Sequence, residues 1–376
     1  EPPACRFGAH HGDAAMKPRI VLGTALFLAL SCLRPSEERA SADLEVGQAQ
    51  QGVLSVNVDD GLAAVRALED DQLVLWGSAP SFSFELTASV DRQLRVDVQN
   101  CLPDAELQVL SGDADVTPLE DSGTPTRKSW RVAMLAGTLR LGLAAPDTDD
   151  AEPFRFALLS DIQEAIDRVS DIYDRLNDVH DLRFVLGAGD LTSRGTREQL
   201  ERFQSELLRL KVPYFATLGN HELGTHPDLF HEYFGRGNFH FRFHGVAFTL
   251  LDDASASIDA TVYDWLDDWL ASSRRDVHIV AMHIPPVDPI GVRNGSMASR
   301  NEADKLLARL AEGRVDMTLY GHVHSYYSFD NAGIPAFISG GGGAIPERFD
   351  RIGRHFMVFD VDAQNGVTAR SVIKVD

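Results

Sequence analysis

Residues 214–222 read Tyr-Phe-Ala-Thr-Leu-Gly-Asn-His-Glu, and this stretch decides how the second half of the chain is interpreted. Its first five residues are mostly apolar, which predicts a short buried strand. Gly219, Asn220, His221 and Glu222 follow directly, so an amide, an imidazole and a carboxylate stand in series where a strand ends. In layered α/β sheets, ligands gather beyond the carboxyl ends of the strands. The stretch therefore predicts one edge of a functional site.

Other apolar strands of the chain are followed by side chains of the same kinds. Predicted strands at 154–159, 184–186, 277–282 and 317–320 each lead into an Asp or a His. Together with Asn220, the side chains near these strand ends are Asp161, Gln163, Asp190, His283, His322 and His324. Carboxylate, amide and imidazole groups are ligands that divalent cations take in proteins. If the fold brings the strand ends together, these residues form a two-metal hydrolytic centre.

Each of these residues also has an ordinary structural interpretation. An Asp after a strand often caps a helix, Gly-Asp marks common turns, and a lone histidine such as His283 is usually a satisfied structural group. His322 and His324 carry more information, because residues two apart in an extended segment face the same side. Chance becomes a poor explanation only when the residues are taken jointly and in order.

Length and hydrophobic pattern divide the chain into two folded parts. With 376 residues, 44% of them hydrophobic, the chain is long enough for two substantial cores. Residues 52–145 hold short stretches that alternate apolar and polar residues, which predicts a small all-β sandwich. Residues 146–153 form a Pro- and Asp-rich linker, and strands alternate with helices over 154–376, which predicts a layered α/β catalytic domain. The role of the β-sandwich stays open between a spacer, a carbohydrate-binding module and a packing partner.

The beginning of the chain is typical of an exported bacterial protein. Residues 16–19 are a short cationic start, and residues 20–30 form an apolar run of signal-peptide length, too short for an ordinary membrane span. Cys32 follows at the position of a lipobox cysteine. We therefore expect 1–32 to comprise an upstream segment and a signal peptide, and 33–51 to be a flexible linker. The mature protein is expected to be a lipoprotein, anchored to a bacterial membrane or periplasmic, with plain secretion and a retained anchor as the alternatives.

The net charge limits the partners expected for the chain, and the cysteine content limits its disulfides. The formal net charge of −21 disfavours long-range attraction of polyanions, so nucleic acid is not expected as a partner. Of the three cysteines, only Cys101 lies in sequence that is predicted to fold, so no internal disulfide is expected. The stability of the mature chain must then come from its hydrophobic cores.

The ordered motifs resemble those of the calcineurin-like metallophosphoesterase superfamily, and the resemblance covers roughly residues 154–376. It implies an αββα sandwich of two sheets that holds two divalent metal ions, chosen from Mn, Fe, Zn and Mg. By this resemblance, the first metal site consists of Asp161, Gln163, Asp190 and His324, and Asp190 bridges to a second site completed by Asn220, His283 and His322. The implied catalytic residues are His221, as transition-state stabiliser or general acid, Arg194, which grips phosphate, and Glu222, which orients the His221 ring unless another carboxylate does.

Two subfamilies stay open, and one position departs from the family. The Gly-His-Val-His motif that ends at His324 and the preceding β-rich region resemble purple acid phosphatases, whereas Gly-Asp-Leu-Thr around Asp190 resembles cyclic-nucleotide phosphodiesterase-like members. Gln163 stands where the family usually has His. A neutral amide oxygen is a harder and weaker donor than imidazole. We therefore expect the first site to favour Mn or Mg over Zn, or to lose its metal readily.

Two functions follow from these expectations. One is hydrolysis of a small phosphomonoester or phosphodiester by a hydroxide activated between the two metals. The other is a lipid-anchored binding or scaffold protein that retains the fold without catalysis. Neither involves nucleic acid, and the membrane is contacted only through the N-terminal lipid anchor.

Overall fold

The computed structural model describes residues 35–376, apart from 121–122, 225–228, 292–294 and 348–350. The expected upstream segment, signal peptide and lipobox residue Cys32 lie outside the described residues. None of the described helices is long and apolar enough to cross a membrane.

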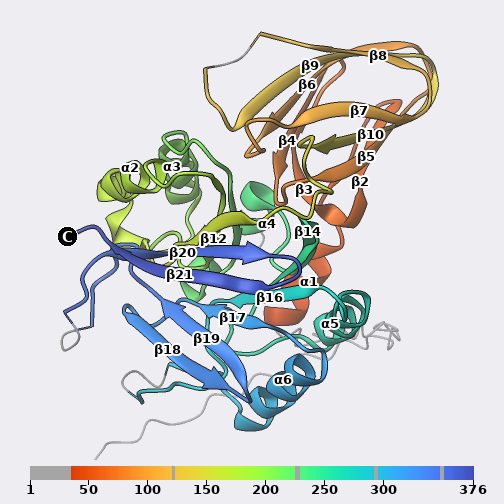
Figure 1. The fold of residues 1–376 in the computed structure, drawn as a ribbon. Coiled ribbons are helices and arrows are strands. Elements are labelled where there is room, and N and C mark those ends of the chain that lie inside the picture. Colours follow the sequence, from red (N-terminus) through yellow and green to blue (C-terminus); the bar gives the residue numbers. More distant parts are fainter. Residues whose placement is uncertain (1–34, 121–122, 225–228, 292–294, 348–350) are drawn as a thin grey trace, which may run out of the picture. The chain divides into compact units, whose positions relative to one another are not determined.

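Ten described strands lie in the part of the chain that precedes the α/β domain (Figure 1). They are β1 (Gln48–Gln51), β2 (Leu54–Val58), β3 (Ala63–Leu68), β4 (Gln72–Gly77), β5 (Phe82–Ala88), β6 (Arg92–Gln99), β7 (Glu106–Ser111), β8 (Ala114–Pro118), β9 (Arg127–Met134) and β10 (Gly137–Ala144). They form two five-stranded sheets, in the orders β1-β2-β5-β10-β7 and β3-β4-β6-β9-β8. Alternate side chains are buried, as in β5, where Phe82, Phe84 and Leu86 face the core. The predicted all-β region is therefore present, although one strand pair, β4 with β6, is parallel.

The α/β domain contains two further sheets. The first has the order β13-β12-β11-β20-β21, with β11 (Phe154–Leu158), β12 (Leu182–Ala188), β13 (Tyr214–Thr217), β20 (His355–Asp362) and β21 (Gly366–Lys374). The second has the order β14-β15-β16-β17-β19-β18, with β14 (Phe239–Phe243), β15 (Val246–Leu251), β16 (Val277–Met282), β17 (Met317–Tyr320), β18 (Tyr326–Asn331) and β19 (Ile334–Ser339).

Aromatic side chains join the inner faces of these two sheets. Phe156 and Phe184 of the first sheet both meet Phe248 of the second edge-on, with ring centroids 5.4 Å apart. Helices α2 (Ser170–Asn177) and α3 (Arg197–Leu207) pack on the outer face of the first sheet, and α5 (Ala260–Ser272) and α6 (Arg300–Glu312) pack on the second (Figure 1). Shorter helical segments are η1 (Asp59–Gly61), η2 (Gln163–Arg168), η3 (Asn220–Leu223) and α4 (Leu229–Phe234). The expected αββα sandwich is confirmed.

Parallel pairing places the functional loops at common sheet edges. Strands β11, β12 and β13 pair in parallel, and so do β15, β16, β17 and β19. The carboxyl ends of parallel strands lie at the same edge of a sheet, so the loops that follow them are neighbours. The loops after β11, β12, β13, β16 and β17 carry all seven predicted metal ligands.

The prediction of a flexible linker over 33–51 is wrong where the structure describes this segment. Helix α1 (Pro35–Asp43) and strand β1 occupy it. Arg39 of α1 is buried, with 1% of its surface exposed, and its Nε lies 2.5 Å from Oδ2 of the buried Asp252. The polar composition suggested a solvated tether, but the charges are matched inside the protein, which is the condition for burying an ion pair.

Asp43 anchors the other end of α1. Its carboxylate accepts the N–H of Gly237 at 2.7 Å, the side-chain amide of Asn238 at 2.8 Å, and a contact from Nε2 of His231 at 3.0 Å. His231 lies in α4, and Gly237 and Asn238 directly precede β14. Polar contacts with the α/β domain therefore hold α1 at two points, Arg39 and Asp43.

Candidate metal centre

Three loops that carry predicted ligands are joined by hydrogen bonds from their backbone N–H groups. The N–H groups of Ile162 and Gln163 donate to the carbonyl of Asp190 at 2.9 and 3.2 Å. The N–H of His322 donates to both carboxylate oxygens of Asp161 at 3.0 Å. Asp161, Gln163, Asp190 and His322 have φ angles of 60°, 48°, 53° and 68°, a left-handed conformation that is costly for residues with a Cβ. Such strain persists where the surroundings over-determine the backbone, and it clusters at functional sites.

Two glycines allow these loops to touch. A Cβ on Gly219 would lie 2.2 Å from the backbone nitrogen of Asp190, and a Cβ on Gly321 would lie 2.6 Å from Oδ2 of Asp161. Real Cβ atoms do not approach other atoms so closely. Only glycine therefore fits at these two positions of close backbone approach.

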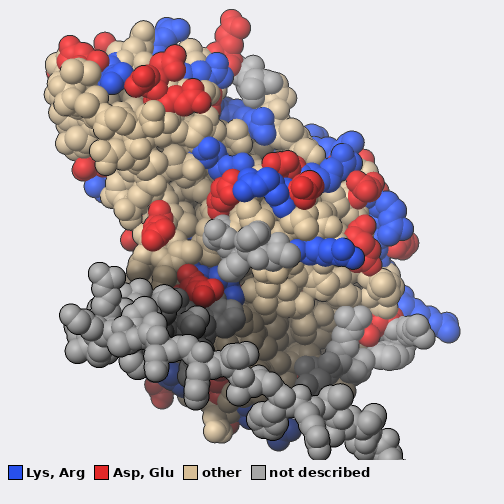
Figure 2. Space-filling view, turned by 180° about the vertical axis from the view of Figure 1, so that it is seen from behind, with Lys and Arg blue, Asp and Glu red and all other residues tan. Residues whose placement is uncertain are grey.

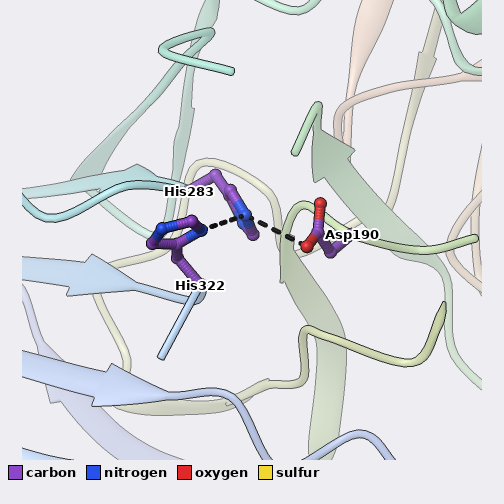
Figure 3. A group of neighbouring side chains, drawn as sticks. All are labelled: Asp190, His283 and His322. Carbon is purple, nitrogen blue, oxygen red and sulfur yellow. Dashed lines mark hydrogen bonds and ion pairs between the residues drawn. The ribbon is translucent and has the colours of Figure 1, made fainter. Parts of the chain in front are cut away.

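Asp190, His283, His322 and Asn220 converge in a first group of donors. Nε2 of His283 lies 3.3 Å from Oδ2 of Asp190, 3.2 Å from Nδ1 of His322 and 3.1 Å from Oδ1 of Asn220. In Figure 3 the His283 ring stands between His322 and Asp190 and makes a contact with each. One donor atom from each of Asp190, His283 and His322 lies within 4.8 Å of the other two, a spacing that one cation can bridge.

Asp161, Asp190, His324 and Gln163 form a second group that shares Asp190 with the first. Nε2 of His324 lies 3.5 Å from Oδ1 of Asp161, and the donor atoms of Asp161, Asp190 and His324 lie within 4.8 Å of one another. The side-chain Nε2 of Gln163 donates to Oδ2 of Asp190 at 2.8 Å and lies 3.2 Å from Nε2 of His324. A half-turn of the amide exchanges Nε2 for Oε1, so Gln163 can offer an oxygen to the same space. The structure thus brings all seven predicted ligands together.

Backbone carbonyls set the orientation of the imidazoles. Nδ1–H of His283 donates to the carbonyl of Ala188 at 2.7 Å, and Nδ1–H of His324 donates to the carbonyl of Ile345 at 2.7 Å. A neutral ring that donates from Nδ1 keeps the lone pair of Nε2, the atom that faces the carboxylates here. Such a hydrogen bond behind a metal-binding histidine fixes both its tautomer and its direction.

Burial and charge make this cluster a good cation site. Asp161 and Asp190 are 0% and 1% exposed. Burial raises the pKa of Asp161, although His283 and His324 oppose this. Burial also acts to raise the pKa of Asp190, but the charge and hydrogen bond of His283 together with those of His221 outweigh it, so the pKa of Asp190 is lowered. For His283 the effect of burial is reversed by Asp190 and Asp161, which raise its pKa to about 10. Two buried carboxylates, three imidazoles and two amides are a donor set that fits two divalent cations.

Two of the predicted catalytic residues lie in loops beside the candidate ligands. The N–H of His221 donates to Oδ1 of Asp190 at 2.9 Å, and its Nε2 lies 3.9 Å from Oδ2 of Asp190. The His221 side chain is 35% exposed, so it faces both the donor groups and solvent. Arg194 has an exposed side chain, and its backbone N–H donates to Oε1 of Gln199 at 2.9 Å. Its contact with phosphate stays a prediction.

The prediction that Glu222 orients the ring of His221 is wrong. The carbonyl of Ser193 lies 2.7 Å from Nδ1 of His221 and takes that role. Glu222 is buried, and its carboxylate accepts the N–H and the hydroxyl of Thr192 at 2.9 Å and the N–H of Gly219 at 3.0 Å. Glu222 therefore ties the loop after β12 to the loop after β13 and positions the neighbouring ligands.

Asp253 is a buried carboxylate at the centre that was not among the predicted site residues. Its Oδ1 accepts the N–H groups of His283 and Ile284, each at 3.0 Å. Burial raises the pKa of Asp253 to about 7. The sequence did hold a signal, because Asp252 and Asp253 follow the apolar strand β15 as the predicted ligands follow theirs. Asp253 positions the loop that carries His283.

Comparison with known proteins agrees with this geometry. The sequence model of the calcineurin-like phosphoesterase family matches residues 154–326, a range that contains all seven donors. Residues 154–326 belong to the calcineurin-like phosphoesterase family.

Similar proteins support this assignment of the calcineurin-like phosphoesterase domain. A 3′,5′-cyclic-nucleotide phosphodiesterase of Nostoc sp. (strain PCC 7120) is 27% identical over 157 residues, which are 39% of this chain and 58% of the relative. The chain thus spans little more than half the length of that relative. A purple acid phosphatase from yellow lupin (Lupinus luteus) seeds matches the structure with a TM-score of 0.50 at 14% identity, over 79% of this chain and 73% of that chain. At this identity, the likeness shows a common fold.

Proposed function

We propose that this protein is a metal-dependent phosphoesterase that hydrolyses a small phosphomonoester or phosphodiester. The observation that carries the proposal is the place of Asp190, whose carboxylate belongs to both candidate cation groups. A shared carboxylate can hold two cations at a spacing of about 3.5–4 Å, which two-metal phosphoryl-transfer centres use. The calcineurin-like phosphoesterase family and the activity of the Nostoc relative support phosphoester chemistry.

In this proposal the chain supplies ligands, orientation and a proton. Asp161, Gln163, Asp190 and His324 would hold one cation, and Asn220, His283 and His322 with Asp190 would hold the other. When bound, two such cations polarise phosphoryl oxygens and lower the pKa of a water between them. The Ser193 carbonyl holds Nδ1 of His221, so its Nε2 can protonate the oxygen of the leaving group. The chain needs no covalent intermediate for this chemistry.

The sequence is the basis for two further parts of the proposal, namely export of the protein and the class of its partners. Residues 16–32 support export with a lipid on Cys32, and mass analysis of the mature N-terminus would test it. Figure 2 shows one face of the protein on which Lys and Arg side chains are interspersed with Asp and Glu. The net charge of −21 disfavours nucleic acid as a partner, and the match to the calcineurin-like phosphoesterase family supports a small phosphoester as the substrate.

Elemental analysis and chelation test the proposed function. We expect the purified protein to carry up to two divalent cations per chain, and to hydrolyse para-nitrophenyl phosphate, its bis-ester or a cyclic nucleotide. Turnover should stop after chelation and return when Mn is added, because the donor groups hold the cations that activate the water. Two bound metals without turnover on a broad phosphoester panel would contradict the proposal and favour a non-catalytic binding protein with the same fold.

Replacing Gln163 by His is expected to raise zinc affinity at one of the two sites. An imidazole at this position is a softer and stronger donor than the amide that now faces Asp190 and His324. Zinc titration by calorimetry should show that the weaker of two binding steps tightens by at least about tenfold in Gln163→His. Gln93→His, an exposed glutamine in the β-sandwich, serves as the control. An unchanged weaker step would mean that Gln163 does not limit metal binding.

A further inference from the structure

Two pockets are lined by residues that lie close in the chain to candidate metal ligands. One, of about 630 Å³, is lined by Glu164, Ala165, Arg168, Asp171, Gly343, Ala344, Ile345, Pro346, Gly353, Arg354 and Asp376. The other, of about 400 Å³, is lined by Pro286, Val287, Asp288, Gly291, Ser296, Arg300, Ala303 and Asp304. We call them the Ile345 pocket and the Val287 pocket. A phosphoester bound at the centre must direct its leaving group somewhere, and each pocket is a candidate.

Hydrogen bonds join the wall of the Ile345 pocket to two candidate ligands. The N–H of Ala344 donates to the carbonyl of Asp161 at 2.9 Å, and the carbonyl of Ile345 accepts Nδ1–H of His324 at 2.7 Å. Glu164, another residue of the lining, directly follows Gln163 in the chain. The Ile345 pocket is therefore built onto the group formed by Asp161, Gln163 and His324.

The Ile345 side chain is an apolar group held at the surface. It is 70% exposed, although both its carbonyl and the N–H of its neighbour Ala344 are bound to the centre. The exposed side chain of Pro346 extends the apolar surface beside it. A single exposed apolar side chain is common on proteins. Here, however, the backbone bonds fix its position beside a metal ligand, where a substrate can cover it.

The charged groups of the Ile345 pocket argue against an anionic leaving group. Nη2 of Arg354 is engaged by Asp171 at 2.5 Å and by Asp376 at 2.6 Å, so two carboxylates already match this guanidinium. Glu164 adds a third carboxylate, and Arg168 is the other cation of the lining. A pocket with an apolar wall and a slight excess of negative charge suits an uncharged group that carries a ring.

The lining of the Val287 pocket begins at Pro286, three residues after the candidate ligand His283. A Cβ on Gly295 would lie 3.4 Å from Cδ2 of His322, and Oδ2 of Asp288 accepts the Gly295 N–H at 3.1 Å. Its exposed apolar side chain, Val287, is 44% exposed. Among the hydrogen bonds described, two join the wall of the Ile345 pocket to the candidate ligands Asp161 and His324.

We propose that the Ile345 pocket is the leaving-group subsite, and that it selects phosphoesters whose leaving group is an uncharged alcohol with an aromatic ring. This inference rests on the proposed phosphoesterase function. The ring would lie against the side chain of Ile345, while the phosphoryl group lies at the cluster around Asp190. Covering Ile345 with a ring removes apolar surface from water and so favours binding of such esters.

Steady-state kinetics of the metal-loaded full chain test the subsite. Naphthyl phosphate and glycerol phosphate are compared in the unmodified protein, in Ile345→Ala and in the control Val287→Ala; their methyl diesters replace them if only diesters are hydrolysed. For each ester, kcat/KM of the variant is divided by kcat/KM of the unmodified protein, which cancels the intrinsic reactivity of that ester. In Ile345→Ala we expect the ratio of kcat/KM for naphthyl phosphate to that for glycerol phosphate to fall roughly five- to tenfold. The change should lie in KM for naphthyl phosphate, while kcat of the two esters changes alike. Val287→Ala should keep the preference.

Each other outcome overturns the subsite in a recognisable way. If Ile345→Ala keeps the preference for naphthyl phosphate, the ring does not contact Ile345. If Val287→Ala loses the preference instead, the leaving group lies in the Val287 pocket. If the unmodified protein, with metals bound, hydrolyses neither ester nor their diesters, the proposed function fails and the subsite falls with it.

Discussion

Asp190→Asn is expected to lower kcat/KM by on the order of 10⁴-fold and to release bound metal. The carboxylate of Asp190 takes part in both donor groups, so its loss weakens two cation sites at once. The amide that replaces it is neutral, and it leaves the imidazole of His283, whose pKa the carboxylate raises, without its main partner. Mutation of a residue that only hydrogen-bonds to a metal ligand lowers metal affinity or activity about 10- to 100-fold. Loss of a ligand shared by two cations should lower both far more.

Metal content and turnover of Asp190→Asn should be measured on the same preparation. Asp104→Asn is the matched control, because Asp104 is a partly exposed carboxylate that pairs with Arg183 outside the centre, at 3.0 Å. Exposed pairs of this kind contribute about 0–1 kcal/mol, so Asp104→Asn should fold and hydrolyse as the unmodified protein does. Full metal content and turnover in Asp190→Asn would refute the shared-ligand arrangement. Circular dichroism of both variants shows whether the fold is retained.

His221→Asn is expected to lower kcat by roughly 10²- to 10⁴-fold for esters with poor leaving groups, and much less for para-nitrophenyl esters. The reason is that Nε2 of His221 faces the centre without belonging to either donor group, while the Ser193 carbonyl holds Nδ1. A proton donor matters most when the departing oxygen is a strong base. Bound metal should stay unchanged in this variant.

A series of phosphoesters with leaving groups of graded acidity separates the two roles open to His221. If it is a general acid, the rate of His221→Asn depends more steeply on the acidity of the leaving group than that of the unmodified protein. An equal loss across the series would contradict proton donation and leave transition-state stabilisation. His180→Asn is the control, since the His180 side chain is 85% exposed and pairs only with its neighbour Asp181 among the contacts described.

The sequence predicted the sheet edges of the centre well, for a physical reason. A buried parallel strand needs an apolar run, and the first polar residues after it must lie at the carboxyl edge, so Asp190, Asn220 and His322 could be placed by reading along the chain. The same rule applies to Asp253, which follows β15 and was not among the predicted site residues. The positions of Asp161 and Gln163 in the left-handed region have no counterpart in the sequence, since contacts between distant loops create them.

Other parts of the site could not be predicted from residue types. The carbonyls of Ala188, Ser193 and Ile345 orient three histidines, and every residue has a carbonyl. Glu222 was expected to serve the ring of His221 because carboxylates often do so, but its neighbours Thr192 and Gly219 offer it three donors within 3.0 Å. Hydrogen-bond partners depend on which loops meet, and only the fold decides that.

Helix α1 stabilises the α/β domain through the buried contacts of Arg39 and Asp43. Were a protease to clip the chain behind Asp43, the carboxylate of Asp252 would stay in a dry interior with no guanidinium, and Asn238 would lose its acceptor. Removing one partner of a buried ion pair costs about 3–5 kcal/mol. This is a large share of the free energy of unfolding of a typical protein, which is roughly 5–15 kcal/mol. A flexible tether could be removed without effect on stability. Removal of α1 should instead make the α/β domain unfold more readily.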